Sequence, residues 1–173
     1  MQLLNTIKDE IPDWAKDIHL NLHSLLALPG KLSREDALAT ALASAFAAKS
    51  PFLIEQFKSG LSETDATAAL TAAALMGMNN IWYPYGEMTG DEQLKKMPAG
   101  LRMNAYGTHG GVEKKRFELF ALAASIIGKC HFCVKSHYEL LKQEGLSTEQ
   151  LHEAGRIAAV VNAAAQVLAA QGK

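Results

Sequence analysis

The chain has 173 residues, enough for one domain of ordinary size, of which 49% are hydrophobic and 20% charged. This composition excludes a disordered tail and a collagen-like fibre. Lys and Arg (17) nearly balance Asp and Glu (18), for a formal net charge of −1, so neither nucleic-acid binding nor a polybasic membrane anchor is predicted.

Alanine dominates the sequence, whereas Val and Ile are scarce and rarely alternate with polar residues. This pattern favours helices over strands and predicts an all-α fold. Proline, glycine and serine set the expected helix ends. In the first half, helices are expected up to Glu10, from Pro12 toward Leu28, from the Ser33 cap to Ala48, from Pro51 to Lys58, and from the Ser62 cap to Tyr83.

The stretch from Pro84 to Val112 is polar and rich in glycine, with at most short helical turns around residues 91–96. It is too long for a plain connector in a compact domain. A surface excursion or part of a subunit contact is therefore expected. Three further helices are predicted after it, over Glu113–Lys129, Cys130–Glu144 and Ser147–Ala170.

The two halves of the chain resemble each other. Residues 49–54 align with residues 129–134, Gly60 to Ser62 align with Gly145 to Ser147, and a long alanine-rich helix follows each time. The prediction is one domain, 1–173, with a cysteine-free first repeat over 30–83 and a second over 113–171. A chance match between two alanine-rich sequences is the alternative explanation of this similarity. The first repeat carries Ser50, Leu53 and Phe57 where the second carries Cys130, Cys133 and His137.

The candidate chemistry lies in the motif C-x-x-C-x-x-x-H formed by Cys130, Cys133 and His137. On a helix these residues share one stripe, and the two cysteines fall within the range of a disulfide. So small a loop adds little stability, which favours a switch between dithiol and disulfide. Cys130 lies in the first helical turn, where a thiolate is stabilised. His137, one turn beyond Cys133, is the expected base.

Glu118 is the third component, because it lies on a helix that is apolar on nearly all sides and is therefore expected to be at least partly buried. A tight corner at Gly128-Lys129 would bring Glu118 and His137 together across a helical hairpin. A carboxylate that orients an imidazole, which in turn activates a thiol, follows the logic of a catalytic triad.

One alternative concerns a different class of protein. Cys130, Cys133, His137 and Glu118 could form a structural metal site, although ligands spread along one helix stripe over about 10 Å suit a single tetrahedral ion poorly. His19 and His23 are interpreted as helix-surface residues.

No run of apolar residues is long enough for a membrane span, and no secretory signal is evident, so a cytoplasmic location is expected.

Glu118 followed by Cys130-x-x-Cys133-x-x-x-His137 resembles the AhpD-type alkyl hydroperoxidases of the carboxymuconolactone-decarboxylase-like superfamily. Residues 76–80 and 101–104 also look like that family. The resemblance implies an all-α fold with an internal repeat, usually a homotrimer. It implies that Cys133 attacks and forms a sulfenic acid or mixed disulfide, and that Cys130 donates a proton and closes the disulfide. Glu118 and His137 would form the proton relay.

The resemblance also implies partners. Electrons would come from dihydrolipoamide on a lipoyl-bearing 2-oxoacid dehydrogenase component and pass to a peroxiredoxin of the AhpC type, with weak direct peroxidase activity and no tightly bound cofactor. Some relatives have histidine just before the second cysteine, where this chain has Phe132, and whether His131 substitutes is open. A superfamily decarboxylase, which needs no cysteine pair, is the remaining alternative.

Overall fold

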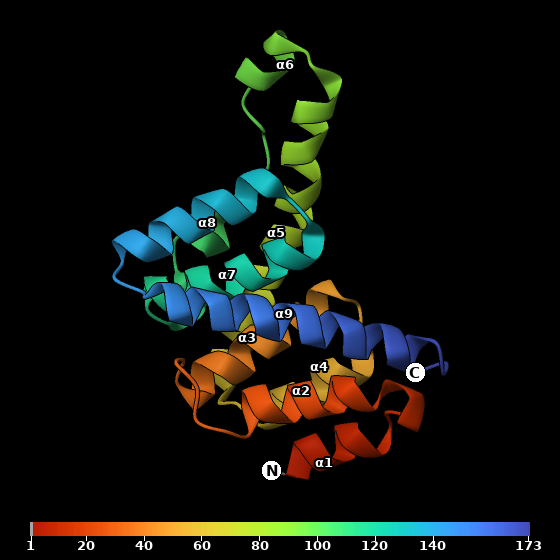
Figure 1. Cartoon of the computed structure of the whole chain (residues 1–173). Coiled ribbons are helices and arrows are strands. Elements are labelled where there is room, and N and C mark those ends of the chain that lie inside the picture. The colour runs from red at the N-terminus through yellow and green to blue at the C-terminus, as the bar shows by residue number, and fades with distance from the viewer. Residues whose placement is uncertain (1) are drawn as a thin grey trace.

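The computed structural model describes residues 2–173 and contains only helices within that range (Figure 1). The predicted all-α fold is confirmed, and most expected helix ends lie within a few residues of those observed. The elements are α1 (Gln2–Asp9), the 3-10 helix η1 (Asp13–Ala15), α2 (Lys16–Leu26), α3 (Arg34–Ala47), α4 (Pro51–Ser59), α5 (Glu63–Thr89), α6 (Glu92–Lys96), the 3-10 helices η2 (Asn104–Tyr106) and η3 (His109–Gly111), α7 (Lys114–Gly128), α8 (His131–Gln143) and α9 (Thr148–Ala169).

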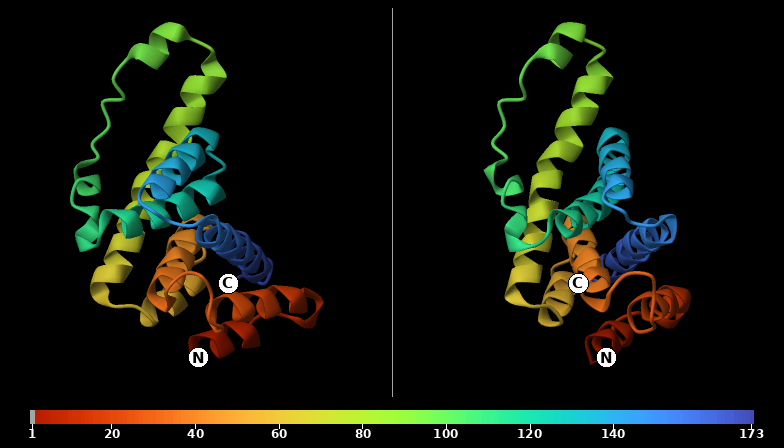
Figure 2. Two further views of the ribbon diagram at one scale, coloured as in Figure 1. Left: turned by 60° about the vertical axis from the view of Figure 1, so that its left-hand side comes forward. Right: turned by 90° about the vertical axis from the view of Figure 1, so that its left-hand side faces the viewer.

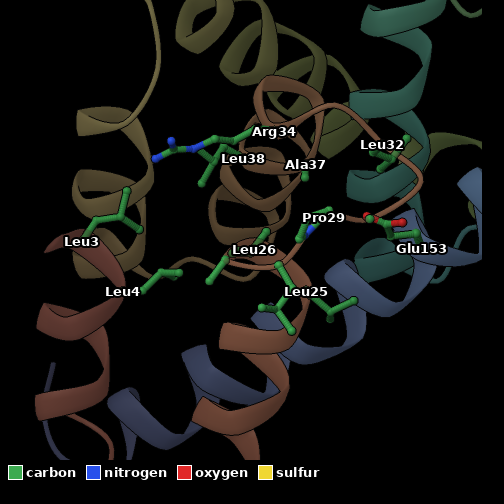
Figure 3. A pocket seen from close by; sticks show the side chains of 13 residues that line it. Leu3, Leu4, Leu25, Leu26, Pro29, Leu32, Arg34, Ala37, Leu38 and Glu153 are labelled. Carbon is green, nitrogen blue, oxygen red and sulfur yellow. The ribbon is translucent and has the colours of Figure 1, made fainter. Parts of the chain in front are cut away.

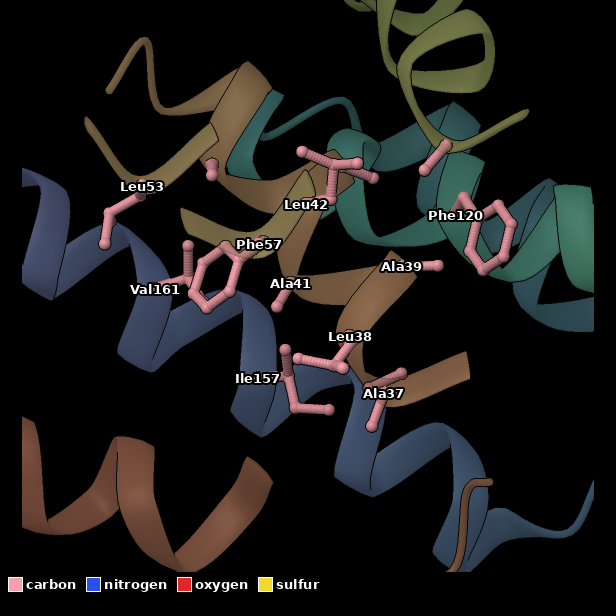
Figure 4. Close-up of a cluster of buried hydrophobic side chains, with 14 of the residues drawn as sticks. Ala37, Leu38, Ala39, Ala41, Leu42, Leu53, Phe57, Phe120, Ile157 and Val161 are labelled. Carbon is pink, nitrogen blue, oxygen red and sulfur yellow. The ribbon is translucent and has the colours of Figure 1, made fainter. Parts of the chain in front are cut away.

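The hydrophobic core surrounds α3, which packs against α4, α5, α7 and α9. The alanines on several faces of α3 are fully buried, and their small side chains let the neighbouring helices approach closely. Large side chains fill the spaces between these helices (Figure 4): Leu42, Leu53, Phe57, Phe120 and Ile157. The helices that carry the C-x-x-C motif and Glu118 therefore rest on a rigid base.

Serine side chains cap the helices where the sequence predicts them. The hydroxyl oxygens of Ser33 and Ser62 each accept a hydrogen bond, 3.1 Å long, from the backbone N–H three residues ahead. Ser147 forms a full capping box with Gln150 at the start of α9. These caps satisfy backbone donors that the first turn of a helix leaves unpaired.

The expected end of α5 near Tyr83 is wrong, because the helix continues through Pro84 to Thr89 and ends at Gly90, whose φ of 64° is left-handed. Proline deprives the carbonyl of Asn80 of its helical partner. Residues 81–87 are all exposed or half-buried, so water has access to this turn of the helix. We call residues 81–103 the arm. Figure 2 shows the end of α5 extending beyond the other helices, with α6 at its tip.

The proposed internal repeat stays a prediction, with supporting details at two corresponding corners. Lys49 and Lys129 both have positive φ, at 59° and 55°. The residue after each is the N-cap of the next helix: Ser50 accepts from the backbone N–H of Leu53, and Cys130 from that of Cys133. Each corner therefore joins two helices by the same local geometry.

Arg116 of α7 connects the starts of two other helices. Its Nε lies 2.6 Å from Asp36 of α3, and its Nη1 lies 2.6 Å from Asp65 of α5. All three side chains are mostly buried, with 22% of the Arg116 side chain exposed. The guanidinium thus neutralises two carboxylates that would otherwise face each other.

We expect Arg116→Met to lower the free energy of unfolding by about 2 kcal/mol, because it leaves two partly buried carboxylates without their partner. Urea unfolding followed by circular dichroism measures this change. Lys115→Met is the matched control, since half of the Lys115 side chain is exposed and its ion pair with Glu113 lies at the surface. The control should change stability by less than about 0.5 kcal/mol. Equal effects of the two substitutions would contradict the role of Arg116.

In the described part of the chain, no helix combines the length and the apolar character that crossing a membrane requires.

Candidate active site

The corner between α7 and α8 positions the cysteine pair. α7 ends at Gly128, Lys129 adopts a left-handed conformation, and Cys130 is the N-cap of α8. A Cβ atom on Gly128 would collide with the side-chain amide of Asn80. The missing side chain of Gly128 therefore lets α5 approach the corner, where Asn80 Nδ2 donates to the carbonyl of Ala124 at 3.1 Å.

Cys130 and Cys133 form a disulfide across the first turn of α8, with their Cα atoms 5.3 Å apart. Cys130 Sγ also accepts a hydrogen bond of 3.2 Å from the backbone N–H of Cys133. Cys130 is fully buried, whereas 3% of Cys133 is exposed. Both sulfurs lie at the positive end of the helix dipole, which stabilises a thiolate after reduction.

Glu118 and His137 meet across the corner. His137 Nδ1 lies 2.6 Å from Glu118 Oε2, and the side chains are almost completely buried. Burial by itself would raise the pKa of Glu118. The hydrogen bonds from His137 and Tyr106, with the positive charges of His137 and Lys114, outweigh burial and lower the pKa below its ordinary value. Glu118 is therefore held as a carboxylate that accepts from the imidazole.

The other ring nitrogen of His137 faces sulfur, but not a cysteine. Nε2 lies 3.1 Å from Sδ of Met76, a buried residue of α5. Within residues 2–173, no hydrogen bond joins His137 to Cys130 or Cys133 in this disulfide state. Nδ1 is therefore placed to donate to the Glu118 carboxylate, while Nε2 lies against the thioether of Met76. The imidazole can exchange a proton once the disulfide opens.

The structure joins the four residues that the sequence singled out in two pairs, Cys130 with Cys133 and Glu118 with His137, and His137 follows Cys133 by one turn on α8. Two further residues, Tyr106 and Met76, were not assigned to the site from the sequence. Met76 belongs to the family-like segment 76–80, which was a usable signal. Tyr106 gave no signal, because it lies in an irregular segment twelve residues before Glu118.

His131 lies outside this group. It is exposed and lines a shallow surface with Lys129 and Lys135. Phe132 is 49% exposed and stacks on Tyr83 of the arm, with ring centroids 4.6 Å apart. In the part of the chain that the structure describes, no hydrogen bond joins His131 to His137 or Glu118. The structure therefore does not support the idea that His131 replaces the histidine that some relatives have at position 132.

The alternative of a metal site gains no support either. Over residues 2–173, no three His, Cys, Asp or Glu side chains are grouped closely enough to hold a metal ion. The two cysteines are bonded to each other, and His137 is directed toward Glu118 and Met76. The arrangement can instead exchange electrons through a disulfide and a proton through the imidazole.

A separate cleft of about 400 Å³ lies between α1, α2, α3 and the start of α9 (Figure 3). Leucines form most of its wall, and Glu153 lies on one side. α1 and α2 are at the end of the molecule opposite α6 (Figure 1). The cleft contains none of the four residues that the sequence singled out.

Comparison with known proteins gives consistent matches. A model of the carboxymuconolactone decarboxylase family matches residues 92–171. Over 172 residues, the chain is 40% identical to alkyl hydroperoxide reductase AhpD of Rhodospirillum centenum, covering 97% of this chain and 91% of the relative. AhpD of Gluconacetobacter diazotrophicus is 43% identical over 169 residues, covering 95% and 92%. AhpD of Coxiella burnetii is 38% identical over 177 residues, covering 99% of each chain.

Proposed function

Since the chain belongs to the AhpD-type alkyl hydroperoxide reductases of the carboxymuconolactone decarboxylase family, we propose that it uses Cys130 and Cys133 to reduce alkyl hydroperoxides, an oxidised peroxiredoxin, or both. Dihydrolipoamide supplies the electrons. The observation that supports this proposal most is the disulfide in the first turn of α8, one turn before a buried imidazole held by a carboxylate.

In the peroxide reaction, the Cys133 thiolate attacks a peroxide oxygen. The new S–O bond forms as the O–O bond breaks, and the alcohol leaves with a proton from the relay. Cys130 then attacks the sulfenic acid on Cys133, which forms the disulfide and releases water. Two electrons pass from the dithiol to the peroxide, which agrees with the oxidised state of the cysteine pair in the structure.

Reduction of the disulfide restores the enzyme. A thiolate of dihydrolipoamide attacks Cys133, the less completely buried of the two cysteines, and forms a mixed disulfide while Cys130 leaves as a thiolate. The second lipoyl thiol attacks the mixed disulfide, which releases lipoamide and frees Cys133. The N–H group of Cys133, which donates to Cys130 Sγ, stabilises the leaving thiolate. An oxidised peroxiredoxin accepts the same two electrons by thiol–disulfide exchange.

The partners follow from this chemistry. We propose a lipoyl-bearing 2-oxoacid dehydrogenase component as the donor and an AhpC-type peroxiredoxin as an acceptor, in the cytoplasm. We also propose a homotrimer, the assembly that the family resemblance implies, and the arm exposes apolar side chains that a neighbouring copy would cover. These are Ile81, Tyr83, Tyr85, Met88, Met97 and Leu101. Light scattering of the purified protein measures the mass of the assembly.

The proposed activity predicts that the purified protein oxidises more than one equivalent of dihydrolipoamide only when an alkyl hydroperoxide or an oxidised AhpC-type peroxiredoxin is present. The assay follows loss of lipoyl thiols with tert-butyl hydroperoxide and with the peroxiredoxin separately. Glutathione is the control donor and should be far slower, since it has one thiol and cannot close an intramolecular disulfide. Failure to consume dihydrolipoamide with either acceptor would contradict the proposal.

A further inference from the structure

Tyr106 is a neighbour of the candidate site that the mechanism above does not use. It is the last residue of η2, in the segment that leads from the arm to α7, and its hydroxyl donates a hydrogen bond to Glu118 Oε1. The phenol ring packs edge-on against Phe117, with ring centroids 5.6 Å apart, and lies near His109. The aromatic contacts hold the ring so that its hydroxyl reaches the carboxylate.

The two oxygens of Glu118 therefore have different donors. Oε2 accepts from His137 Nδ1 and Oε1 accepts from Tyr106. None of the Glu118 side chain is exposed, so bulk solvent cannot donate a hydrogen bond to it. Without a protein donor, a carboxylate oxygen would therefore be left buried and unpaired, which is costly. The Tyr106 hydroxyl prevents this, and it also blocks rotation of the carboxylate away from His137.

The charges around this pair leave Tyr106 as a neutral donor. Burial, the hydrogen bond to Glu118 and the negative charge of Glu118 all raise the pKa of Tyr106. Around Glu118, the described residues place His137 on α8, Tyr106 on η2 and Lys114 on α7. Tyr106 thus keeps its proton over the range in which a thiol enzyme works.

We propose that Tyr106 is a positioning residue, whose hydroxyl acts through Glu118 to keep the proton of His137 on Nδ1 and so to leave Nε2 as the nitrogen that exchanges a proton with the cysteines. The proposal rests on the proposed function for its catalytic consequence, but the position of the proton on His137 is independent of any substrate. A fixed Nδ1–H leaves Nε2 as the only nitrogen that can exchange a proton with a thiol.

Tyr106→Phe tests the role of the hydroxyl, because it keeps the ring and its packing against Phe117. With dihydrolipoamide and tert-butyl hydroperoxide, we expect kcat to fall about tenfold, the size of effect typical for loss of a hydrogen-bond partner behind a functional imidazole. The KM for dihydrolipoamide should not change. The acidic limb of the pH profile should move to higher pH, since removing a donor from Glu118 favours its protonated form.

The matched control is Tyr85→Phe, which removes a hydroxyl from an exposed tyrosine of the arm. A double-mutant cycle adds a sharper criterion. In a Glu118→Gln background, Tyr106→Phe should cause almost no additional loss, because its effect passes through the charge of Glu118. A full tenfold loss in that background, or an unchanged rate and pH profile in the single variant, would overturn the proposal.

Nitrogen-15 spectra of the His137 ring supply a measurement that does not depend on turnover. In the parent protein the Nδ1 signal should be that of a protonated nitrogen, whereas Tyr106→Phe should give a mixture of ring tautomers. Identical ring signals in two folded proteins would contradict the positioning role. If the parent protein reduces no peroxide but the ring signals change as expected, the proposed function fails and the role of Tyr106 stands.

Discussion

Replacement of Cys133 by serine should abolish turnover of alkyl hydroperoxides, with a loss on the order of 10⁴-fold or more, as expected when the nucleophile of a covalent mechanism is removed. Serine keeps the size of the side chain but cannot form the disulfide with Cys130. Cys130→Ser should also stop turnover, for a different reason. The Cys133 thiol can still react once with peroxide, but its sulfenic acid has no partner with which to close a disulfide.

Trapping with dimedone, which reacts with sulfenic acids, distinguishes the two variants by mass spectrometry. After one addition of peroxide, Cys130→Ser should carry the adduct on Cys133, and Cys133→Ser should carry little or none. Ser136→Ala, at an exposed position on the same helix, is the control and should keep parental activity. Parental turnover by Cys130→Ser with dihydrolipoamide would disprove the mechanism. A decarboxylase activity, in contrast, would survive both cysteine substitutions.

The division of roles between the cysteines depends on two competing local effects. Cys130 is the N-cap, and its sulfur accepts the N–H of Cys133, so helix geometry alone favours the thiolate at Cys130. Cys133 is one turn from His137 and retains the exposed fraction of the pair. These effects are compatible, because a stabilised Cys130 thiolate is a good leaving group when a donor attacks Cys133.

The sequence predicted the features that depend on local rules. Serine caps, glycine stops and the tight corner at Gly128-Lys129 are properties of a few neighbouring residues, so the predicted helix ends were largely correct. The contact between Glu118 and His137 also follows from local rules, since both residues lie a few turns from one corner. Pro84 shows where such rules fail: an exposed helix can tolerate the missing hydrogen bond that would end a buried one.

The features that could not be predicted depend on how distant segments pack. Met76 reaches His137 only because α5 lies against α8, and the sequence separation is 61 residues. Tyr106 reaches Glu118 through the path of an irregular segment whose course no helical period describes. A composition rich in alanine indicates that helices pack closely, but it does not determine which helix faces pack against each other.

Replacing the relay should have the second largest effect. We expect His137→Phe to slow turnover by about 10²- to 10⁴-fold, the usual range for loss of a general acid–base. Glu118→Gln keeps the shape of the side chain but removes its charge. We expect it to slow turnover by a factor in the lower part of that range. Stopped-flow measurement of thiol oxidation and of disulfide reduction separates the two half-reactions. Parental rates in both would contradict a role for the relay.

Glu118→Gln also has a consequence for stability that depends on pH. The pKa of Glu118 is lowered in the folded protein, so its interactions as a carboxylate stabilise the fold above its unfolded pKa of about 4.3 and are lost as the pH falls through the lower folded value. Urea unfolding of the parent and the variant should therefore give a constant difference between about pH 5 and 7 and a shrinking one below about pH 4. A difference that grows in favour of the parent as the pH falls would mean that burial dominates and that Glu118 is protonated in the fold, in which case His137 would have no anionic partner.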